Sequence, residues 1–322
     1  MIRRLRSFAS ANDTPPYDYK AVVRMGHPIL WLVGLLVLTS CAPPRVNSIV
    51  IGAKNFTEQV VLGELLAQEI DAVFAAEGHP EEHVERRFYL AGSYLCQQAL
   101  VTGRIDGYVE YTGTALTAIL KQPLPPVKDP AAVFATVKSL YESRYNVRVE
   151  PGLGFEDTFA MVVRGDDADR DHLTKISDVQ ARADQMRLGV GYEFQARPDG
   201  LAGLESAYAL HFATPRVMDL GLLYRALASH QVDIVAGNST DGPIRALGFR
   251  VLADDRHYFP PYEAVPLIRE DSLARHPEIQ VAMNRLAGQV SAFEMQAMND
   301  AVDGRHEDVA AVVRKFRTGK GL

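Results

Sequence analysis

Apolar positions along the chain alternate between two spacings, which predicts alternating strands and helices. Residues 48–53 form a β-branched run typical of a buried strand, and apolar side chains then recur at helical spacing over 61–74. Further strands are expected at 84–89, 105–109, 159–163, 188–190, 216–219, 233–236 and 265–269. Further helices are expected at 93–101, 112–120, 130–145, 201–212, 222–229, 278–287 and 303–316. This order predicts an α/β protein with mainly parallel sheets.

Polar and aromatic residues gather just after predicted strands, where predicted helices begin. Such clusters occupy 54–59, 90–94, 110–114, 192–200 and 237–242. In open α/β sheets, ligands bind outside the carboxyl ends of the strands, where helix N-termini attract anions. Taken singly, Thr57, Thr112 and Thr240 are readily explained as helix N-caps. Five such junctions together predict a ligand cleft.

A leader precedes this region. Residues 29–38 are apolar and are followed by Thr39-Ser40-Cys41. The run is shorter than the ~20 residues of a spanning helix and, with basic residues before it, has the length of a signal-peptide core. Residues 38–41 resemble the lipobox of bacterial lipoproteins. We therefore expect a signal peptide over 1–40, a lipid on Cys41, a tether over 41–47 and a location outside the cytoplasm at a bacterial membrane. A short anchor helix or core helix is the alternative, and Met25 is an alternative start.

Composition favours a soluble globular body after the leader. Of the 322 residues, 47% are hydrophobic and 23% are charged, as in packed proteins. The formal net charge of −6 argues against nucleic-acid binding, which favours basic surfaces. The chain has two cysteines, and lipidation uses Cys41. Cys96 is then expected to be a lone buried thiol, without a disulfide framework.

Motifs of catalysis are missing from the sequence. The chain has neither Gly-x-Ser-x-Gly nor a phosphate-binding Gly-rich loop ending in Lys-Ser or Lys-Thr. His79 and His83 are four residues apart, a spacing that suits metal ligands on one helix face. They lie among Pro, Glu and Arg, however, which favours a charged surface loop. We expect no enzyme activity, no cofactor and no metal.

Longer motifs follow one another in a fixed order. They are Ile51-Gly-Ala-Lys-Asn-Phe-Thr-Glu-Gln59, Ile105-Asp-Gly-Tyr-Val-Glu-Tyr-Thr-Gly-Thr114, Met218-Asp-Leu-Gly-Leu-Leu-Tyr224, Ser239-Thr-Asp-Gly242 and Phe259-Pro-Pro-Tyr-Glu-Ala-Val-Pro266. Together they resemble signatures of osmoprotectant-binding proteins, the substrate-binding lipoproteins of ABC importers for glycine betaine, choline, carnitine and related quaternary amines. The resemblance extends from about Ile49 to the last predicted helix.

The resemblance implies a periplasmic-binding-protein fold, type II-like, in which two α/β lobes are joined by two crossover strands and close over a ligand cleft. Lobe 1 would comprise 48–152 and 254–322, and lobe 2 would comprise 153–253. The crossings would lie near 150–155 and 252–259. The resemblance also implies delivery of the ligand to permease subunits in the membrane, and we expect a monomer.

A quaternary amine imposes chemical demands on its site. A trimethylammonium group has no N–H to donate, so aromatic faces must hold it by cation–π attraction, at roughly 0.5–2 kcal/mol per ring. Tyr111 and Tyr224 lie on the family motifs and are the strongest candidates for an aromatic cage. Weaker candidates, each also explained by core packing, are Tyr94, Phe194, Phe56 and Tyr192.

The polar end of the ligand needs other partners. Arg197 can offer a bidentate fork to a carboxylate, and residues 193–200 resemble the family's Glu-Phe-x-x-Arg-x-Asp-Gly. A salt bridge to Glu193 or Asp199 is the alternative for Arg197. Asp241 either stabilises the cation or begins the next helix. The remaining polar candidates are Asn55, Thr112, Thr158 and Thr240.

One departure from the family bears on the ligand. Family members often carry Asn-Asn-Thr-Tyr where this chain has Glu156-Asp-Thr-Phe159. Two acidic side chains facing the cleft would repel a carboxylate and favour a purely cationic ligand. Two alternative functions stay open: a binding protein of the same fold for another small solute such as an amino acid, with Glu193 or Asp157 holding its ammonium, or a sensory lipoprotein without a transport role.

Overall fold

A computed structural model describes residues 48–123 and 128–322. The predicted signal peptide, the lipidation site Cys41 and the tether lie outside the described residues. Within the described residues, none of the helices combines the length and the apolar character needed to cross a membrane.

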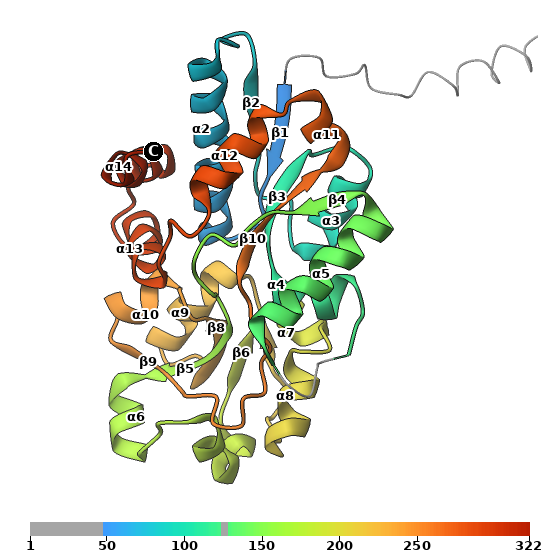
Figure 1. Ribbon diagram of the computed structural model, residues 1–322. Helices are drawn as coiled ribbons and strands as arrows, with labels where there is room; N and C mark the ends of the chain where they lie inside the picture. Colours follow the sequence, from blue (N-terminus) through green and yellow to red (C-terminus); the bar gives the residue numbers. More distant parts are fainter. Residues whose placement is uncertain (1–47, 124–127) are drawn as a thin grey trace, which may run out of the picture. The chain divides into compact units, whose positions relative to one another are not determined.

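The first sheet has the strand order β2-β1-β3-β10-β4 (Figure 1). Its strands are β1 (Ser48–Gly52), β2 (His83–Arg87), β3 (Gly107–Tyr111), β4 (Val147–Val149) and β10 (Ala264–Arg269). β1 is parallel to β2 and β3, whereas β10 is antiparallel to β3 and β4.

The second sheet has the strand order β7-β6-β8-β5-β9. Its strands are β5 (Phe159–Arg164), β6 (Leu188–Val190), β7 (Arg216–Val217), β8 (Ile234–Asn238) and β9 (Phe249–Val251). β6 is parallel to β7 and β8, whereas β5 is antiparallel to β8 and β9.

The prediction of mainly parallel sheets holds for the direction of most strands, but it missed one strand in each sheet, β10 and β5, that runs against its neighbours. β5 follows the segment 150–158 that leaves the first sheet, and β10 follows the segment 252–263 that leaves the second sheet. A helix crossover within one sheet returns the chain parallel to its start. A strand that enters from the other sheet is free of that constraint, so β5 and β10 enter antiparallel.

These two crossing segments lie side by side. The amide of Leu153 donates to the carbonyl of Ala264 at 2.9 Å, and the amide of Asp157 donates to the carbonyl of Tyr262 at 3.1 Å. Gly154 has a φ of +111°, a value that side chains disfavour, and a Cβ there would lie 2.9 Å from Val290 O. The predicted lobe boundaries at 152–153 and 253–254 fall within these segments and stay predictions.

Helices follow the strands. Those between or after strands of the first sheet are α2 (Thr57–Glu77), α3 (Ser93–Val101), α4 (Thr112–Thr114), the π-helix η2 (Ala115–Ile119), α5 (Pro130–Tyr145), α11 (Glu270–Arg275), α12 (Glu278–Leu286), α13 (Ala292–Asp303) and α14 (Val309–Lys320). Those of the second sheet are α6 (Gly165–Asp171), the 3₁₀ helix η3 (Ile176–Gln185), α7 (Tyr192–Ala196), α8 (Leu201–Tyr208), α9 (Leu220–Ala228) and α10 (Gly242–Ala246).

The C-terminal region differs from the prediction of one helix over 303–316. α13 begins where Ser291 and Glu294 form a reciprocal capping box, and it ends at Asp303. A new helix, α14, starts after Asp308, whose side chain accepts a hydrogen bond from the Ala311 amide. α12, α13 and α14 all pack against α2, and α13 also contacts α10. The strands β4 and β9 and the helices α6 and η3 were likewise not predicted.

Hydrophobic packing holds the described region together. Residues 47–322 form one compact unit with its own core, in which α2 buries Leu62, Leu65 and Leu66 completely. Each fully buried leucine contributes about 1.5–3 kcal/mol. Cys96 is a free, buried thiol, as predicted.

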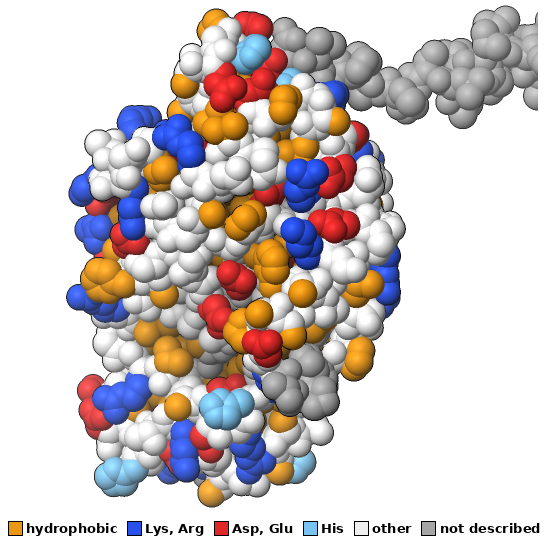
Figure 2. All heavy atoms as spheres, in the orientation of Figure 1, with side chains coloured by type: hydrophobic (Ala, Val, Ile, Leu, Met, Phe, Trp, Pro, Cys, Tyr) orange, Lys and Arg blue, Asp and Glu red, His pale blue; other side chains and the backbone are white. Residues whose placement is uncertain are grey.

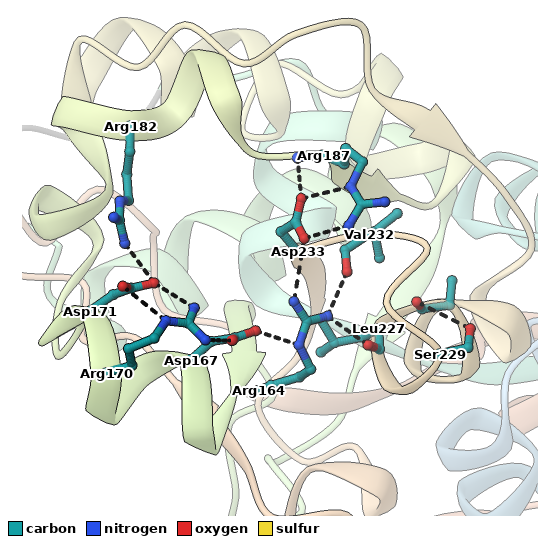
Figure 3. A network of polar contacts seen from close by, with 11 residues as sticks. Arg164, Asp167, Arg170, Asp171, Arg182, Arg187, Leu227, Ser229, Val232 and Asp233 are labelled. Atoms are coloured by element: carbon teal, nitrogen blue, oxygen red, sulfur yellow. Dashed lines mark hydrogen bonds and ion pairs between the residues drawn. The ribbon is translucent and has the colours of Figure 1, made fainter.

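An ionic network lies at the edge of the second sheet where β5 ends (Figure 3). Arg164 donates to the carbonyl oxygens of Leu227 and Val232, both at 2.7 Å, and also pairs with Asp233. Arg187 lies 2.7 Å from the same carboxylate, and its hydrogen bond is the main reason that the pKa of Asp233 falls to about 2. The network links Arg164 at the end of β5 with Arg187, just before β6, and with Asp233, just before β8.

Candidate ligand-binding site

A cavity of about 190 Å³ lies between the two sheets. The lining includes residues at or just after the carboxyl ends of β1, β2, β3, β6, β7 and β8, where the sequence predicted a cleft. It also includes Phe159 at the start of β5 and Tyr262 just before β10. Both antiparallel strands begin at the edge where their parallel neighbours end, so both crossings deliver an aromatic side chain to the cavity.

Aromatic side chains form much of the lining. Phe159 is central, with ring centroids 4.9 Å from Phe194 and 5.7 Å from Tyr262, both in edge-to-face geometry. Phe56, Tyr111 and Tyr192 also line the cavity. Rings gathered in this way offer π-electron faces and apolar surface to a cation that has no hydrogen-bond donor.

Arg197 lies beside these rings in a buried ion pair. Its Nε is 2.9 Å from Asp199 Oδ1 and its Nη2 is 2.5 Å from Asp199 Oδ2, while its Nη1 is 3.8 Å from Glu193. Burial lowers the pKa of Arg197, but Asp199, Tyr262 and Glu193 together raise it above its ordinary value. The guanidinium carbon lies 4.7 Å from the centroid of Phe159. The sequence left open a salt bridge to Glu193 or Asp199, and the structure contains both contacts: the pair with Asp199 is buried, whereas Glu193 is partly exposed.

Lys54, the second basic residue of the cavity, is also neutralised. Its ammonium contacts the carboxylate of Glu110, and both side chains are buried. The same ammonium lies 4.8 Å from the ring centroid of Tyr111. The cavity therefore contains two cations whose charges are already balanced by protein carboxylates.

A buried carboxylate network connects the two sheets beside the cavity. Tyr111 donates to Glu58 Oε1 at 2.6 Å, and Asn299 donates to Glu58 Oε2 at 2.9 Å. The Thr240 hydroxyl contacts Glu58 Oε2 and also lies 2.7 Å from Asp157 Oδ1. Burial is the main cause that raises the pKa of both Glu58 and Asp157.

Six of the predicted candidate residues line the cavity: Asn55, Phe56, Tyr111, Tyr192, Phe194 and Arg197. Their elements converge because β1 and β3 are neighbours in the first sheet, and α7 follows β6 in the second sheet.

The structure places Tyr224 and Asp241 outside this cavity, in the lining of an adjacent hollow. Tyr224 stacks on Phe249 with a centroid distance of 5.9 Å, and its hydroxyl donates to Asp241 at 2.6 Å. Asp241 occupies the N-cap position of α10, yet its side chain makes no capping bond and instead accepts from the Asn238 amide. Burial raises the pKa of Asp241 to about 7.

The other predicted polar residues hold the frame of the site. Thr112 donates to the Pro261 carbonyl and accepts from the Glu263 amide, which ties the second crossing to the first sheet. Thr158 hydrogen-bonds the Phe159 carbonyl, and Thr240 belongs to the carboxylate network. Tyr94 does not line the cavity and is 45% exposed.

Several lining residues were not predicted as ligand contacts: Lys54, Thr114, Phe159, Asp219, Asn238 and Tyr262. The sequence contained a signal for Phe159 and Tyr262, since both lie in segments compared with the family. The rule that ligands meet the carboxyl ends of parallel strands overlooks residues at the start of antiparallel strands.

The histidine pair forms no joint site in the described residues. His83 begins β2 and is exposed, whereas His79 lies 3.5 Å from Glu278. The nearby His276 lies 2.7 Å from Glu82. These are two separate histidine–carboxylate contacts, His79 with Glu278 and His276 with Glu82, and both connect the turn after α2 with the start of α12.

Charged side chains are unevenly spread over the face drawn in Figure 2. Acidic and hydrophobic side chains lie in its middle, whereas basic side chains lie mostly toward its left and right edges, its top and its bottom.

Comparison with known proteins agrees with this geometry. Residues 47–318 match the family described as the substrate-binding domain of ABC-type glycine betaine transport systems. The carnitine transport binding protein OpuCC of Listeria monocytogenes (serotype 1/2a, strain 10403S) is 32% identical over 295 residues, covering 89% of this chain and 93% of that protein. The ergothioneine transport permease/ergothioneine binding protein EgtU of Helicobacter pylori (strain G27) is 30% identical over 278 residues, 85% of this chain and 48% of that protein.

A solved structure is similar over the same region. A crystal structure of a glycine betaine/carnitine/choline ABC transporter protein has a TM-score of 0.69 and 31% identity, covering 85% of this chain and 98% of that chain. The two-sheet fold, the cavity between the sheets and the family match over 47–318 all indicate a substrate-binding protein. This chain belongs to the family of substrate-binding proteins of ABC-type glycine betaine transport systems.

Proposed function

We propose that this protein captures a small quaternary amine in the cavity between the sheets and delivers it to the permease of an ABC importer. The observation that carries the proposal is a cavity between the two sheets, lined by six aromatic side chains, in a member of this family. Proteins of the family are non-enzymatic, extracytoplasmic components of transporters.

The aromatic lining supports a cage for the ligand's cationic head. The geometry favours Tyr111, Phe159, Phe194 and Tyr262 as its rings, in place of the originally expected pair Tyr111 and Tyr224. Each ring would contribute about 0.5–2 kcal/mol, more when water is excluded. Because the rings come from both sheets and both crossings, the cage is complete only when the two sheets approach.

Contacts across the cavity support capture by closure. The Ser93 amide at the start of α3 donates to Glu193 Oε1 of α7 at 2.6 Å. The Thr240 hydroxyl, from the loop before α10, contacts Glu58 of α2. Such bonds between the sheets would stabilise a closed state around a ligand.

Delivery and anchoring complete the proposal. The protein would be held outside the cytoplasm by a lipid on Cys41 and would act as a monomer toward its permease. The name of the Helicobacter pylori relative includes both a permease and a binding protein, which supports such a partner.

Calorimetric titration tests this function. Residues 42–322 would be titrated with glycine betaine, choline, carnitine, proline betaine, ergothioneine and a mixture of the standard amino acids. We expect saturable binding of at least one quaternary amine, lost in Phe159→Ala and Tyr111→Ala. Phe293→Ala is the matched control, because Phe293 is 64% exposed and does not line the cavity.

The outcomes separate the functions. Binding only of amino acids would favour the alternative solute, with Asp157 and Arg197 as the two charged partners. Silence of every ligand with a folded protein would favour the sensory alternative and refute capture of a quaternary amine.

A further inference from the structure

Some of the charged side chains that line the cavity are paired with an opposite charge, and others are not. Lys54 and Arg197 are both neutralised by buried carboxylates, as described above. Glu193 lies near Arg197, and Asp219 is exposed and accepts from the Gly221 amide. Asp157 is 5% exposed, and among the described residues it accepts hydrogen bonds only from the hydroxyls of Ser239 and Thr240 and the Thr240 amide, without an ion pair.

The Thr240 hydroxyl lies between two buried carboxyl groups. A threonine hydroxyl has one hydrogen to donate. Its oxygen nevertheless lies within hydrogen-bond distance of carboxylate oxygens of both Glu58 and Asp157. When the hydroxyl proton points to one carboxylate, the other contact becomes a full hydrogen bond if that carboxyl group is protonated and donates to the threonine oxygen. A single proton shared between the two carboxyl groups through Thr240 would satisfy both contacts.

The surroundings of Asp157 favour the same protonation. Burial, and then the negative charges of Glu58 and Asp241, raise its pKa. The titratable groups that face it are Glu58 of α2, Tyr111 of β3, Tyr224 of α9 and Asp241 before α10. All of them are acidic or neutral, and in the described part of the chain no ion pair joins Asp157 to a cation.

We propose that Asp157 is the counter-ion of the bound ligand, and that a cation enters the cavity in exchange for the proton that Asp157 and Glu58 share through Thr240. The inference rests on the proposed function and names its ligand class: a quaternary amine with a net positive charge and no carboxylate. The released proton passes to the solvent, so charge is conserved as the cation takes its place.

A zwitterion gains less from this site. Its ammonium group would still ionise Asp157, but its carboxylate would find Lys54 and Arg197 already paired. Charges a few ångströms apart at low effective dielectric interact by several kcal/mol. We therefore expect choline to bind at least about tenfold more tightly than glycine betaine.

Two variants test the role of Asp157. Asp157→Asn removes the counter-ion and should remove the preference for choline over glycine betaine. Glu156→Gln removes the same charge from the adjacent, exposed residue, which does not line the cavity, and should leave the preference intact. Equal or tighter binding of glycine betaine by the unaltered protein, or equal effects of the two variants, would overturn the proposal while leaving the proposed function standing.

The proton provides a readout that needs no variant. Choline binding enthalpies would be measured for residues 42–322 at one pH in phosphate and in Tris, whose ionisation enthalpies differ. We expect release of about one proton per choline, and none in a folded Asp157→Asn protein. Choline binding without proton release would refute the exchange. If neither quaternary amine binds to the folded protein, the proposed function itself fails.

Discussion

The buried ion pair between Arg197 and Asp199 should contribute strongly to the stability of the folded protein. Both side chains are almost completely buried, and Asp199 also accepts a hydrogen bond from Tyr262 at 2.6 Å. Asp199→Asn would leave the guanidinium without its bidentate partner, in a site that excludes water. The perturbation is isosteric, so it changes charge and hydrogen bonding and leaves volume unchanged.

The expected cost follows from the burial. Breaking one partner of a buried pair leaves an uncompensated charge and costs about 3–5 kcal/mol. For a domain of this size, that cost corresponds to a decrease in Tm of about 10 °C. Removing both charges in Arg197→Met/Asp199→Asn should recover much of the loss, because no buried charge is then left unpaired.

Urea unfolding followed by circular dichroism measures the free energy of unfolding of each variant. The matched control is Asp171→Asn, which removes a carboxylate paired with Arg170 and Arg182 at the surface. Exposed pairs contribute little, so this control should unfold like the unaltered protein.

The result that would refute the reasoning is a double variant no more stable than Asp199→Asn alone. It would show that packing and the Tyr262 hydrogen bond, rather than the unpaired charge, determine the cost. A loss below about 1 kcal/mol for Asp199→Asn would refute the premise that water is excluded from the pair.

Three further predictions concern other parts of the molecule. Because the pKa of Asp241 is raised to about 7, its contribution to stability is present at low pH and is lost as the pH rises from about 4 to 7. In urea titrations, Asp241→Asn should therefore gain stability relative to the unaltered protein across that range. A difference that stays constant with pH would contradict the raised pKa. In the same assay, Gly154→Ala should destabilise the protein by about 1–3 kcal/mol, because φ is +111° and the new Cβ would contact Val290 O. The control Gly319→Ala lies in helix α14 with open space around it and should be neutral or stabilising. Equal effects of the two variants would contradict the argument. Burial raises the pKa of Cys96 to about 12. Its thiol should therefore resist iodoacetamide at pH 8 in the folded protein and react after unfolding in urea, as followed by mass spectrometry. Rapid labelling of the folded protein would contradict its burial.

Local patterns were sufficient to predict most elements and the family. Strand and helix periodicity depends on neighbouring residues alone, so β1, α2, α5 and β6 lie where the sequence placed them. Short elements such as β9 carry too few residues for a periodic pattern, and the break between α13 and α14 depends on caps at Ser291 and Asp308.

The sequence by itself determined that this chain alternates strands and helices, buries Cys96, and gathers polar and aromatic residues at strand ends as its family does. Only the tertiary structure decided which aromatic rings meet. Phe159 and Tyr262 reach the cavity because β5 and β10 enter their sheets antiparallel, and Tyr224 is drawn away by its contacts with Phe249 and Asp241. The physical reason is that strand direction and side-chain partners depend on contacts between residues far apart in the sequence. The same long-range contacts pair Arg197 with Asp199 beside Tyr262, and leave Asp157 as the buried carboxylate through which we propose the ligand's charge is recognised.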